Sequence, residues 1–569
     1  MAKLQSGDGT WERMVPPEVV QILREREFFG SLKPLLRAHL QIELTAVQGK
    51  VSIVAIRRKH RYAKFKSRPI NQMRLSSALF LAFTLCFPAV TGGRADSFRN
   101  ALGPRFAPAQ SIYLNQAPQK GLDSVHRWNQ IAINATGLDH TPVALGENRV
   151  FGEQLGPGRS SRAMAIVHIA IFDAVNALLG GYHSYTGVSA PQGAASMDAA
   201  VSQAAHDTLV ALFPSQAASF DSLVANDLAQ IKSKTEKMNG IDLGRRAAAA
   251  ILALRLNDGS QIPEPRVGID YFTSDLPGHW RQDPISLIPL ALGAYWGECN
   301  TFVLESSQQF RVPPPPALTS PQYTTAYIEV KAIGGDGVVT PTQRTAEQTF
   351  IGTFWAYDGT PSLCAPPRLY NQIAVLIADQ RKLGVVDLAR LLALTNTAMA
   401  DAGMAVWESK YFYDFWRPIT GIRESDPGTG PTHAGDGNPA TIGDRAFSPL
   451  GAPASNLNAP NFTPPFPAYP SGHAGFGGAL FQTLRRFFGT DAIAFTFVSD
   501  EFNGLTKDHN GNVRPYMPRT FSSLSQAEEE NGQSRIYLGI HWSFDKTQGI
   551  AQGRRVADYV FDHAFRPLP

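Results

Sequence analysis

The chain has 569 residues, of which 43% are hydrophobic, 18% charged and 10% aromatic. This composition is typical of globular proteins and excludes disordered, collagen-like and disulfide-scaffold classes. Three cysteines, Cys86, Cys299 and Cys364, are too few for a disulfide framework or a four-cysteine zinc site. The net charge of +4 is uneven: residues 1–72 hold 14 Lys and Arg against 6 Asp and Glu, whereas residues 96–569 hold 36 against 42. A body of that charge is a poor nucleic-acid binder, because phosphate binding needs clustered basic residues.

The segment 73–95 has the three parts of a secretory signal peptide. It begins Met73-Arg74, continues with an apolar core at 78–87 and ends in a small-x-small site at 93–95. The core is shorter than the roughly 20 apolar residues that span a bilayer, so we expect no stable membrane span in the mature chain and a secreted or periplasmic protein. A buried strand or helix is the alternative. Cleavage after Ala95 would also remove Cys86 and leave two cysteines whose pairing is open.

Residues 1–72 then lie upstream of the start that this signal predicts. They are interpreted as an extension or mis-called start that is poorly ordered. The basic run 57–61 could be a nucleic-acid patch in isolation, but the rest of the chain gives it no support.

The body of the chain predicts helices and little strand. The strongest helix covers 160–179, with Ser160 or Ser161 as its cap and Gly180 at its end, and it is apolar almost all round, so we expect it to be central. No stretch alternates with period two for long, which argues against a sheet. The predicted fold class is all-α, with two layers resembling four-helix bundles, an N-terminal one at 96–330 and a C-terminal one at 331–569. Further helices are predicted near 196–213, 215–231, 240–257, 323–332, 341–353, 368–382, 386–415, 474–488, 493–503, 524–539 and 548–564.

A Pro-, Gly- and Asn-rich stretch at 421–470 is the longest connection of the C-terminal layer, and connections of this length are usually functional. Just before it, Lys410 and Arg417 are seven residues apart, a spacing that places both on one face if the helix continues until Pro418 ends it. They could be solvated surface cations. The many aromatic residues around them indicate burial instead, and buried cations need anionic partners.

Just after it, Pro470 and Ser471 predict the start of a helix whose free amides can bind an oxyanion. Gly472 allows close approach of the backbone to a ligand, and His473 adds a group that titrates near neutrality. An ordinary capped helix with a chance histidine is the alternative.

A third segment, 534–545, contains Arg535, whose planar guanidinium suits oxyanions. Its His541 is followed four residues later by Asp545, which can hold the imidazole by a hydrogen bond if a helix runs through both. A lone histidine is more often a satisfied core residue, but this one shares its segment with an arginine and an acid. Together the three segments supply more donors than a side chain needs, which predicts a cage for phosphate or vanadate.

The motifs Lys-x6-Arg-Pro, Pro-Ser-Gly-His and Ser-Arg-x3-Gly-x-His-x3-Asp resemble those of the superfamily that joins vanadium-dependent haloperoxidases and type 2 phosphatidic acid phosphatases. Around them, 355–359, 366–371, 450–454 and 464–469 are similar to the fungal vanadium chloroperoxidase type. The resemblance covers roughly 340–560. Before 340 it is limited to helical character and to the segment 161–174.

The resemblance implies a vanadate cofactor and an enzyme that oxidises halide with hydrogen peroxide to hypohalous acid, the halide being chloride, bromide or iodide. His541 would be the vanadium ligand, His473 the acid–base group, and Lys410 the residue that polarises peroxide. Asp358 would be the acidic partner of a motif arginine, with a catalytic role, and Trp407 and Phe466 would form the halide pocket. The remaining vanadate-binding residues would be Arg417, Ser471, Gly472 and Arg535.

Two alternatives stay open. The first is a secreted acid phosphatase of the same superfamily, in which His541 attacks phosphorus to form a phosphohistidine and His473 protonates the leaving group. The second is a protein that binds an oxyanion without catalysis. Lys410, the aromatic pair and the chain length favour the haloperoxidase, since type 2 phosphatases are usually much shorter.

Overall fold

Helices make up nearly all the regular structure of the computed structural model, which describes residues 40–47, 50–57, 123–143, 145–452, 462–506 and 512–569. The strands are β1 (Leu40–Val47), β2 (Lys50–Arg57), β3 (Phe495–Phe497) and β4 (Arg519–Phe521), and the short 3-10 turns are η3 (Pro214–Gln216), η4 (Trp296–Glu298) and η5 (Asp500–Phe502). The described α-helices are α4 (Ser124–Asp139), α5 (Gly156–Leu179), α6 (Met197–Leu212), α7 (Ala217–Ala229), α8 (Lys234–Leu254), α9 (Pro321–Ile333), α10 (Ala346–Phe354), α11 (Pro366–Gln380), α12 (Val385–Tyr413), α13 (Pro418–Arg423), α14 (Gly472–Phe488), α15 (Leu524–Tyr537) and α16 (Ser543–His563).

The chain divides into two units, residues 1–88 and 89–569. In the first, β1 and β2 pair antiparallel, with Leu40 opposite Arg57, a hairpin that was not among the predicted elements. The rest of the predicted extension at 1–72 and all of the predicted signal peptide at 73–95 lie outside the described residues, so both stay predictions.

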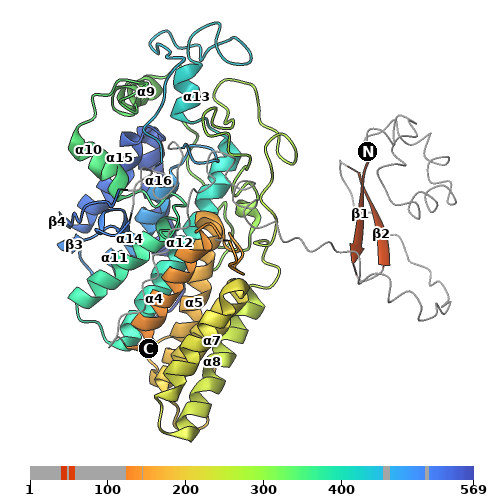
Figure 1. Cartoon of the computed structure of the whole chain (residues 1–569), viewed down its shortest axis with the longest axis vertical. Coiled ribbons are helices and arrows are strands. Elements are labelled where there is room, and N and C mark those ends of the chain that lie inside the picture. The colour runs from red at the N-terminus through yellow and green to blue at the C-terminus, as the bar shows by residue number, and fades with distance from the viewer. Residues whose placement is uncertain (1–39, 48–49, 58–122, 144, 453–461, 507–511) are drawn as a thin grey trace, which may run out of the picture. The chain divides into compact units, whose positions relative to one another are not determined.

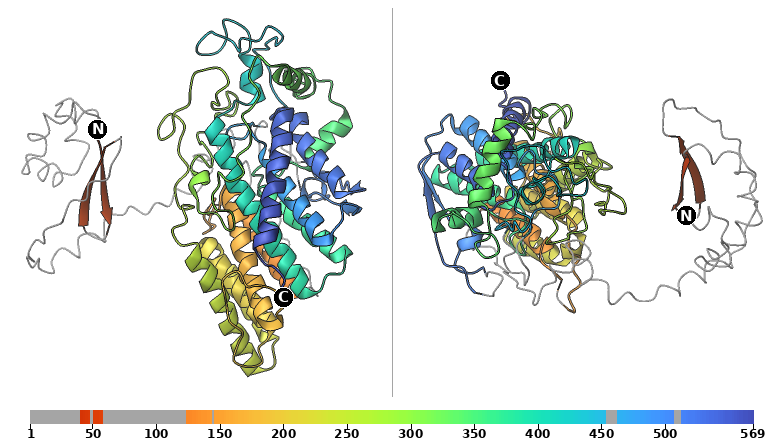
Figure 2. Two further views of the ribbon diagram at one scale, coloured as in Figure 1. Left: turned by 180° about the vertical axis from the view of Figure 1, so that it is seen from behind. Right: turned by 90° about the horizontal axis from the view of Figure 1, so that it is seen from above.

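The second unit has two helical layers that share one long helix (Figures 1 and 2). In the N-terminal layer, α5, α6 and α8 pack together, with α7 and α4 against α6. In the C-terminal layer, α14 packs against both α16 and α15. The 29-residue α12 packs on α5 on one side and on α14 and α16 on the other. One apolar core therefore runs through both layers and positions the C-terminal end of α12 where the predicted site residues lie.

The central helix α5 confirms the predicted burial but begins earlier than expected. Pro157 occupies its first turn, where a missing N–H costs nothing. Ser160 and Ser161 are not caps: each hydroxyl donates to the carbonyl three residues earlier. The helix ends at Gly180, whose φ of 71° favours glycine. It is the one described helix long and apolar enough to cross a membrane, and 83% of its most apolar stretch is buried inside the protein.

Three local predictions were wrong or incomplete. The helix expected at 493–503 is strand β3 followed by η5: Phe495 and Phe497 are buried and Thr496 between them is exposed, a short period-two pattern. Helix α4 was missed, although Asp123 caps it by accepting from the amides of Val125 and His126. Helix α13 was also missed; it begins at Pro418 and extends into the stretch at 421–470 that was expected to be loop.

Candidate active site

The predicted site residues come from five chain segments, and seven of the eleven line one pocket; the other four, which are not lining residues, are Lys410, Arg417, Ser471 and Asp545. The lining of this pocket is mostly apolar, with charged groups at one part of the wall, and its empty space, counted out to the open mouth, is about 760 Å³. The pocket is lined by His140, Leu155, Gly156, Pro157, Leu290, Leu292, Asp358, Gly359, Ala365, Pro366, Trp407, Phe462, Pro464, Pro465, Phe466, Gly472, His473, Phe476, Arg535 and His541.

Lys410 and Arg417 approach the site from different helices, so the prediction that one helix carries both was wrong. Helix α12 ends at Tyr413, and Asp414 follows in the left-handed conformation with φ 50°. Pro418 begins α13 rather than closing α12, and Arg417 is its N-cap residue. The break between α12 and α13 at Asp414, not helical periodicity, separates the two cations.

Lys410 is fully buried and donates two hydrogen bonds, to the carbonyl oxygens of Pro467 at 2.8 Å and Ala468 at 3.0 Å. An ammonium group has three donors, so one hydrogen remains for a ligand. Burial, followed by the nearby Arg417, holds the pKa of Lys410 well below its ordinary value. A bound anion would reverse this penalty, because it stabilises the charged amine.

Arg417 holds the backbone of two other segments and keeps one nitrogen free. Its Nε donates to the carbonyl of Phe466 at 2.9 Å, and Nη1 donates to the carbonyl of Ile540 at 2.9 Å. Nη2 is buried and has no hydrogen-bond partner among the described residues. Burial lowers the pKa of Arg417 to about 9, because the nearby carboxylates do not fully compensate for the solvation that the guanidinium has lost.

Arg535 is tied to Asp358 on one side only. Its Nη2 donates to both carboxylate oxygens of Asp358, at 2.6 and 2.8 Å, the pairing expected of an acidic partner. In the described part of the chain Nε and Nη1 remain buried without a partner. Buried donors left without an acceptor cost free energy, so these two nitrogens require a ligand with acceptor oxygens.

His541 presents a lone pair to the site. Arg417 Nη1 lies 2.9 Å from its Nε2, and a guanidinium can only donate, so Nε2 is unprotonated. The proton is then on Nδ1, which donates to Asp545 Oδ2 at 2.8 Å. Burial and the charge of Arg417 keep the pKa of His541 well below its ordinary value, so Nε2 stays unprotonated. To attack or ligate a bound oxyanion, its lone pair would have to exchange the hydrogen bond from Arg417 for that contact.

The contact between His541 and Asp545 forms without the helix that was expected to carry both. Helix α16 begins at Ser543, so His541 precedes it. Asp545 sits in the first turn, where its carboxylate also accepts the amide of Trp542 at 3.0 Å. Asp545 thus orients the imidazole of His541 from the start of a helix, and not from the next turn of a helix that contains both residues.

The Pro-Ser-Gly-His motif forms the start of α14, as predicted. Ser471 is the N-cap, and its hydroxyl faces the amide of Ala474. The amides at the start of a helix lack carbonyl partners within it and can face an anion. Gly472 is packed closely: a Cβ there would lie 3.2 Å from the indole of Trp407. Any larger side chain would therefore displace the aromatic wall.

His473 is also neutral. Its Nε2 donates to the carbonyl of Ala356 at 2.6 Å, so Nδ1 carries the lone pair. Burial, with the positive charge of Arg535, keeps its pKa well below the ordinary value. Nε2 also lies 3.8 Å from Asp358 Oδ1. A neutral imidazole beside a cationic cage can accept a proton from a bound acid.

Trp407 and Phe466 form the aromatic wall beside the cations. Their ring centroids are 4.9 Å apart, and Lys410 Nζ lies 5.6 Å from the first and 5.1 Å from the second. The indole Nε1 is held by the carbonyl of Leu292 at 3.0 Å. A small polarisable anion could rest between these rings and the ammonium group.

Charge and hydrogen bonding together define the ligand that this cage requires. Three buried cations, Lys410, Arg417 and Arg535, face two carboxylates, the buried Asp545 and Asp358, whose side chain is 5% exposed. Among the described residues no group of three or more His, Cys, Asp or Glu could hold a metal cation. The site therefore suits an oxyanion, and the three unpartnered guanidinium nitrogens show that vanadate or phosphate fits it.

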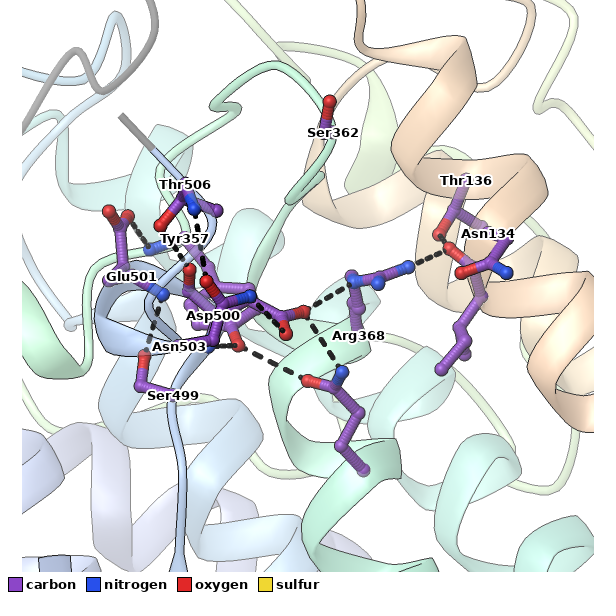
Figure 3. A network of polar contacts seen from close by, with 12 residues as sticks. Asn134, Thr136, Tyr357, Ser362, Arg368, Ser499, Asp500, Glu501, Asn503 and Thr506 are labelled. Carbon is purple, nitrogen blue, oxygen red and sulfur yellow. Dashed lines mark hydrogen bonds and ion pairs between the residues drawn. The ribbon is translucent and has the colours of Figure 1, made fainter. Parts of the chain in front are cut away.

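Sequence reasoning missed the polar network that holds the segment before Asp358 (Figure 3). The hydroxyl of Tyr357 accepts from the amide of Asp500 at 2.6 Å and donates to Gln372 at 3.2 Å. Arg368 and Gln372 both donate to the carboxylate of Asp500. Its members lie about 130 residues apart in the chain, so no local spacing could have revealed it. His140 in the pocket wall was missed for the same reason.

Comparison with known proteins agrees with this geometry. Residues 390–568 match the family model described as VCPO second helical-bundle domain. A vanadium chloroperoxidase of Curvularia inaequalis is 31% identical over 502 residues, which are 74% of this chain and 78% of that protein.

Solved structures show the same fold at low identity. The first bacterial vanadium-dependent iodoperoxidase structure has a TM-score of 0.60 and 22% identity, covering 81% of this chain and 99% of that one. A holo-type bacterial vanadium-dependent chloroperoxidase has a TM-score of 0.54 and 15% identity, covering 79% and 98%. The all-α, two-layer fold predicted from the sequence is confirmed.

The fold is the two-layer helical fold of the vanadium haloperoxidase structures. Within that class the identity of 31% over most of both chains is decisive: the chain belongs to the vanadium chloroperoxidase family of vanadium-dependent haloperoxidases.

Proposed function

We propose that this protein is a vanadate-dependent haloperoxidase that oxidises halide with hydrogen peroxide to hypohalous acid. The observation that carries the proposal is the set of unpartnered donors, Arg417 Nη2 and Arg535 Nε and Nη1, around a site that also receives the lone pair of His541. Membership of a family whose named relatives are vanadium peroxidases supports it.

The residues divide into holding and reacting groups. His541 Nε2 would ligate vanadium, because it is the nitrogen whose lone pair faces the site. Arg417, Arg535 and Lys410, with Ser471 and the amide of Gly472, would hold the oxygens. When bound, vanadate supplies Lewis-acid activation of peroxide without a change of oxidation state.

The protein itself moves the proton and places the halide. His473 would accept a proton from peroxide at Nδ1, since its other nitrogen is held by Ala356. Lys410, with one hydrogen free, would draw electron density from the oxygen that halide attacks. Trp407 and Phe466 would hold the halide beside that ammonium group and limit water. Each preorganised donor contributes about 3 kcal/mol, so losing one costs on the order of a hundredfold in rate.

The test loads the purified, vanadate-free protein with vanadate and measures oxidation of chloride, bromide and iodide by hydrogen peroxide. Hydrolysis of a phosphate ester is measured in parallel on the vanadate-free protein. We expect halide oxidation that depends on vanadate, and loss of vanadate retention in His541→Ala. Turnover of the ester alone would replace the proposal with the phosphatase alternative.

Export to the periplasm or the medium is also proposed. It depends on the signal-like segment 73–95, and N-terminal sequencing of the exported protein tests it.

A further inference from the structure

A second, smaller cavity adjoins the active-site pocket at Trp407. Its empty space, counted out to the open mouth, is about 200 Å³, and within it there is room for about one water-sized ion or molecule. We call this space the side cavity. The residues that line both it and the active-site pocket are Leu155, Gly156, Pro157, Leu292 and Trp407. Trp407 is therefore a wall common to the two spaces.

A further cavity of about 190 Å³ continues the side cavity towards the loop at 259–263. The residues that line both of these small cavities are Arg159, Glu264, Gly293 and Trp296. The three spaces therefore form a row that runs from this loop to the aromatic wall of the active site, and the proposed function uses only the last of them.

The indole N–H of Trp296 has no partner in this row of cavities. Trp296 is 4% exposed, its Nε1 is buried, and no described residue accepts its hydrogen. The ring packs directly on the first turn of α5, because a Cβ on Gly158 would lie 2.8 Å from Nε1. A buried donor without an acceptor costs about 1–3 kcal/mol, so this N–H calls for a bound group that has a lone pair.

The start of α5 adds positive potential at the same place. No side chain caps this 24-residue helix, and Pro157 in its first turn has no N–H. The amide of Gly156 is used by His140 Nε2 at 2.9 Å, whereas the amide of Gly158 has no acceptor inside the helix. Gly158 lines the side cavity. The partial positive charge of a helix N-terminus therefore faces this space.

Arg159 supplies further donors. Its guanidinium pairs with the carboxylate of Glu264 and donates to the carbonyl of Ile262 at 2.5 Å. A guanidinium has five N–H groups, so these two contacts leave donors for a bound group. The other oxygen of Glu264 accepts the amide of Gly293 at 2.5 Å. The carboxylate is thus engaged on both oxygens and does not accept the hydrogen of Trp296.

The charges around the side cavity leave a positive surplus. Arg162 and Arg255 share the carboxylate of Asp258, each at 2.7 Å. With Arg159 and Glu264 the group contains three guanidiniums and two carboxylates. Burial lowers the pKa of Arg159 below its ordinary value, and a bound anion would offset that penalty. The surplus favours an anion over water, and the small space favours a monatomic ion over vanadate or phosphate.

We propose that the side cavity binds a single halide ion through Trp296 Nε1, the amide of Gly158 and the guanidinium of Arg159, and that this ion supplies the active-site pocket beyond Trp407. The supply role rests on the proposed function, whereas the binding does not. The edge of an aromatic ring is its positive part, so the N–H edge of the indole suits an anion. Halide would then have a store that is separated from the vanadate cage by one side chain.

The first test locates bromide, which scatters X-rays anomalously, in crystals of the full-length, vanadate-free protein soaked in sodium bromide. We expect an anomalous peak within hydrogen-bonding distance of Trp296 Nε1, and an occupancy about threefold lower in Trp296→Phe. The control Trp128→Phe makes the same change of ring at an indole that already donates to Ser202 at 2.8 Å, and it should keep the peak. Water in place of bromide, or an equal peak in Trp296→Phe, would overturn the proposal.

The second test measures bromide binding in solution. The thermal unfolding midpoint of the vanadate-free protein is compared in sodium bromide and in sodium methanesulfonate of equal ionic strength. Bromide should raise the midpoint less in Trp296→Phe than in the unsubstituted protein and in Trp128→Phe, because a ligand stabilises only the state that binds it. An equal rise in all three would show binding at crystal concentration only and would overturn the proposal.

A variant of opposite sign keeps the test decisive if Trp296→Phe does not fold. Glu264→Gln removes the negative charge beside the ion and keeps one acceptor oxygen, so bromide occupancy should rise about threefold at soaks below saturation. Glu298→Gln changes an exposed carboxylate near Trp296 and should leave the occupancy unchanged. Unchanged or lower occupancy in Glu264→Gln would contradict the site.

The third test asks whether the bound ion supplies turnover. In the vanadate-loaded enzyme, Trp296→Phe should raise KM for bromide about threefold without changing kcat, since it touches neither vanadate nor peroxide. Trp128→Phe should leave both constants unchanged. An unchanged KM in Trp296→Phe would refute the supply role. If the loaded protein oxidises no halide, the proposed function fails, whereas the diffraction experiment still decides whether the side cavity binds halide.

Discussion

Removing the carboxylate of Asp545 should weaken vanadate binding through His541 without touching the oxyanion. In Asp545→Ala the imidazole loses the acceptor of its Nδ1 proton, at 2.8 Å, and can rotate or move the proton to Nε2. The lone pair then no longer faces the site in every molecule. Loss of a hydrogen bond of this kind behind a metal-binding histidine typically costs 10- to 100-fold in affinity, which is about 1.4–2.7 kcal/mol.

Stability should fall as well, by an amount that follows from the same contacts. Asp545 accepts from His541 and from the amide of Trp542, and both donors would remain buried. Each unsatisfied buried donor costs about 1–3 kcal/mol, so we expect the free energy of unfolding to drop by about 2–6 kcal/mol. Asp545→Asn keeps an acceptor oxygen and should lose less than tenfold in affinity.

The measurement is the dissociation constant of vanadate, from titration of vanadate-free protein at a temperature where circular dichroism shows each variant folded. The control is Asp558→Ala on the same helix, whose carboxylate is 42% exposed and pairs with Arg486, and which should bind like the unsubstituted protein. A folded Asp545→Ala variant that binds vanadate with unchanged affinity would refute the assigned tautomer and the role of His541.

Asp358→Ala should lower the free energy of unfolding of the vanadate-free protein by about 3–5 kcal/mol, because Arg535 stays buried without its partner; in urea unfolding, a loss no larger than that of the exposed control Asp270→Ala would contradict this. Burial raises the pKa of Asp401 to about 6. Between about pH 4 and pH 6 the native state therefore retains a proton that the unfolded state has lost. The free energy of unfolding should decrease as the pH rises through this range, by at most about 1.4 kcal/mol per pH unit. Asp401→Asn should flatten this dependence, and an unchanged slope would count against it. Export should yield a mature protein that begins at Asp96, and Edman sequencing that finds the intact N-terminus would disprove it.

The sequence predicted the helices best where apolar periodicity was long, as in α5 and α12. It misplaced boundaries where a proline could start a helix as well as end one: Pro157 lies in the first turn of α5, before the serines, and Pro418 begins α13. It failed at 493–503 because three residues of alternation are too short a signal for a strand.

The sequence indicated which residues form the site but not which helix ends and turns position them. Lys410 and Arg417 do meet, but through a left-handed residue at 414 that ends α12. His541 and Asp545 do meet, but across a helix start. Hydrogen bonds such as that of His473 to Ala356 join residues over a hundred positions apart, and a single sequence carries no signal for them.

The long helix α12 makes the two layers inseparable. Helix α5, apolar enough to enter a lipid bilayer by composition, is covered by α12, which begins more than 200 residues after it. A fragment that ended before α12 would leave this surface uncovered and should aggregate or adhere to lipid.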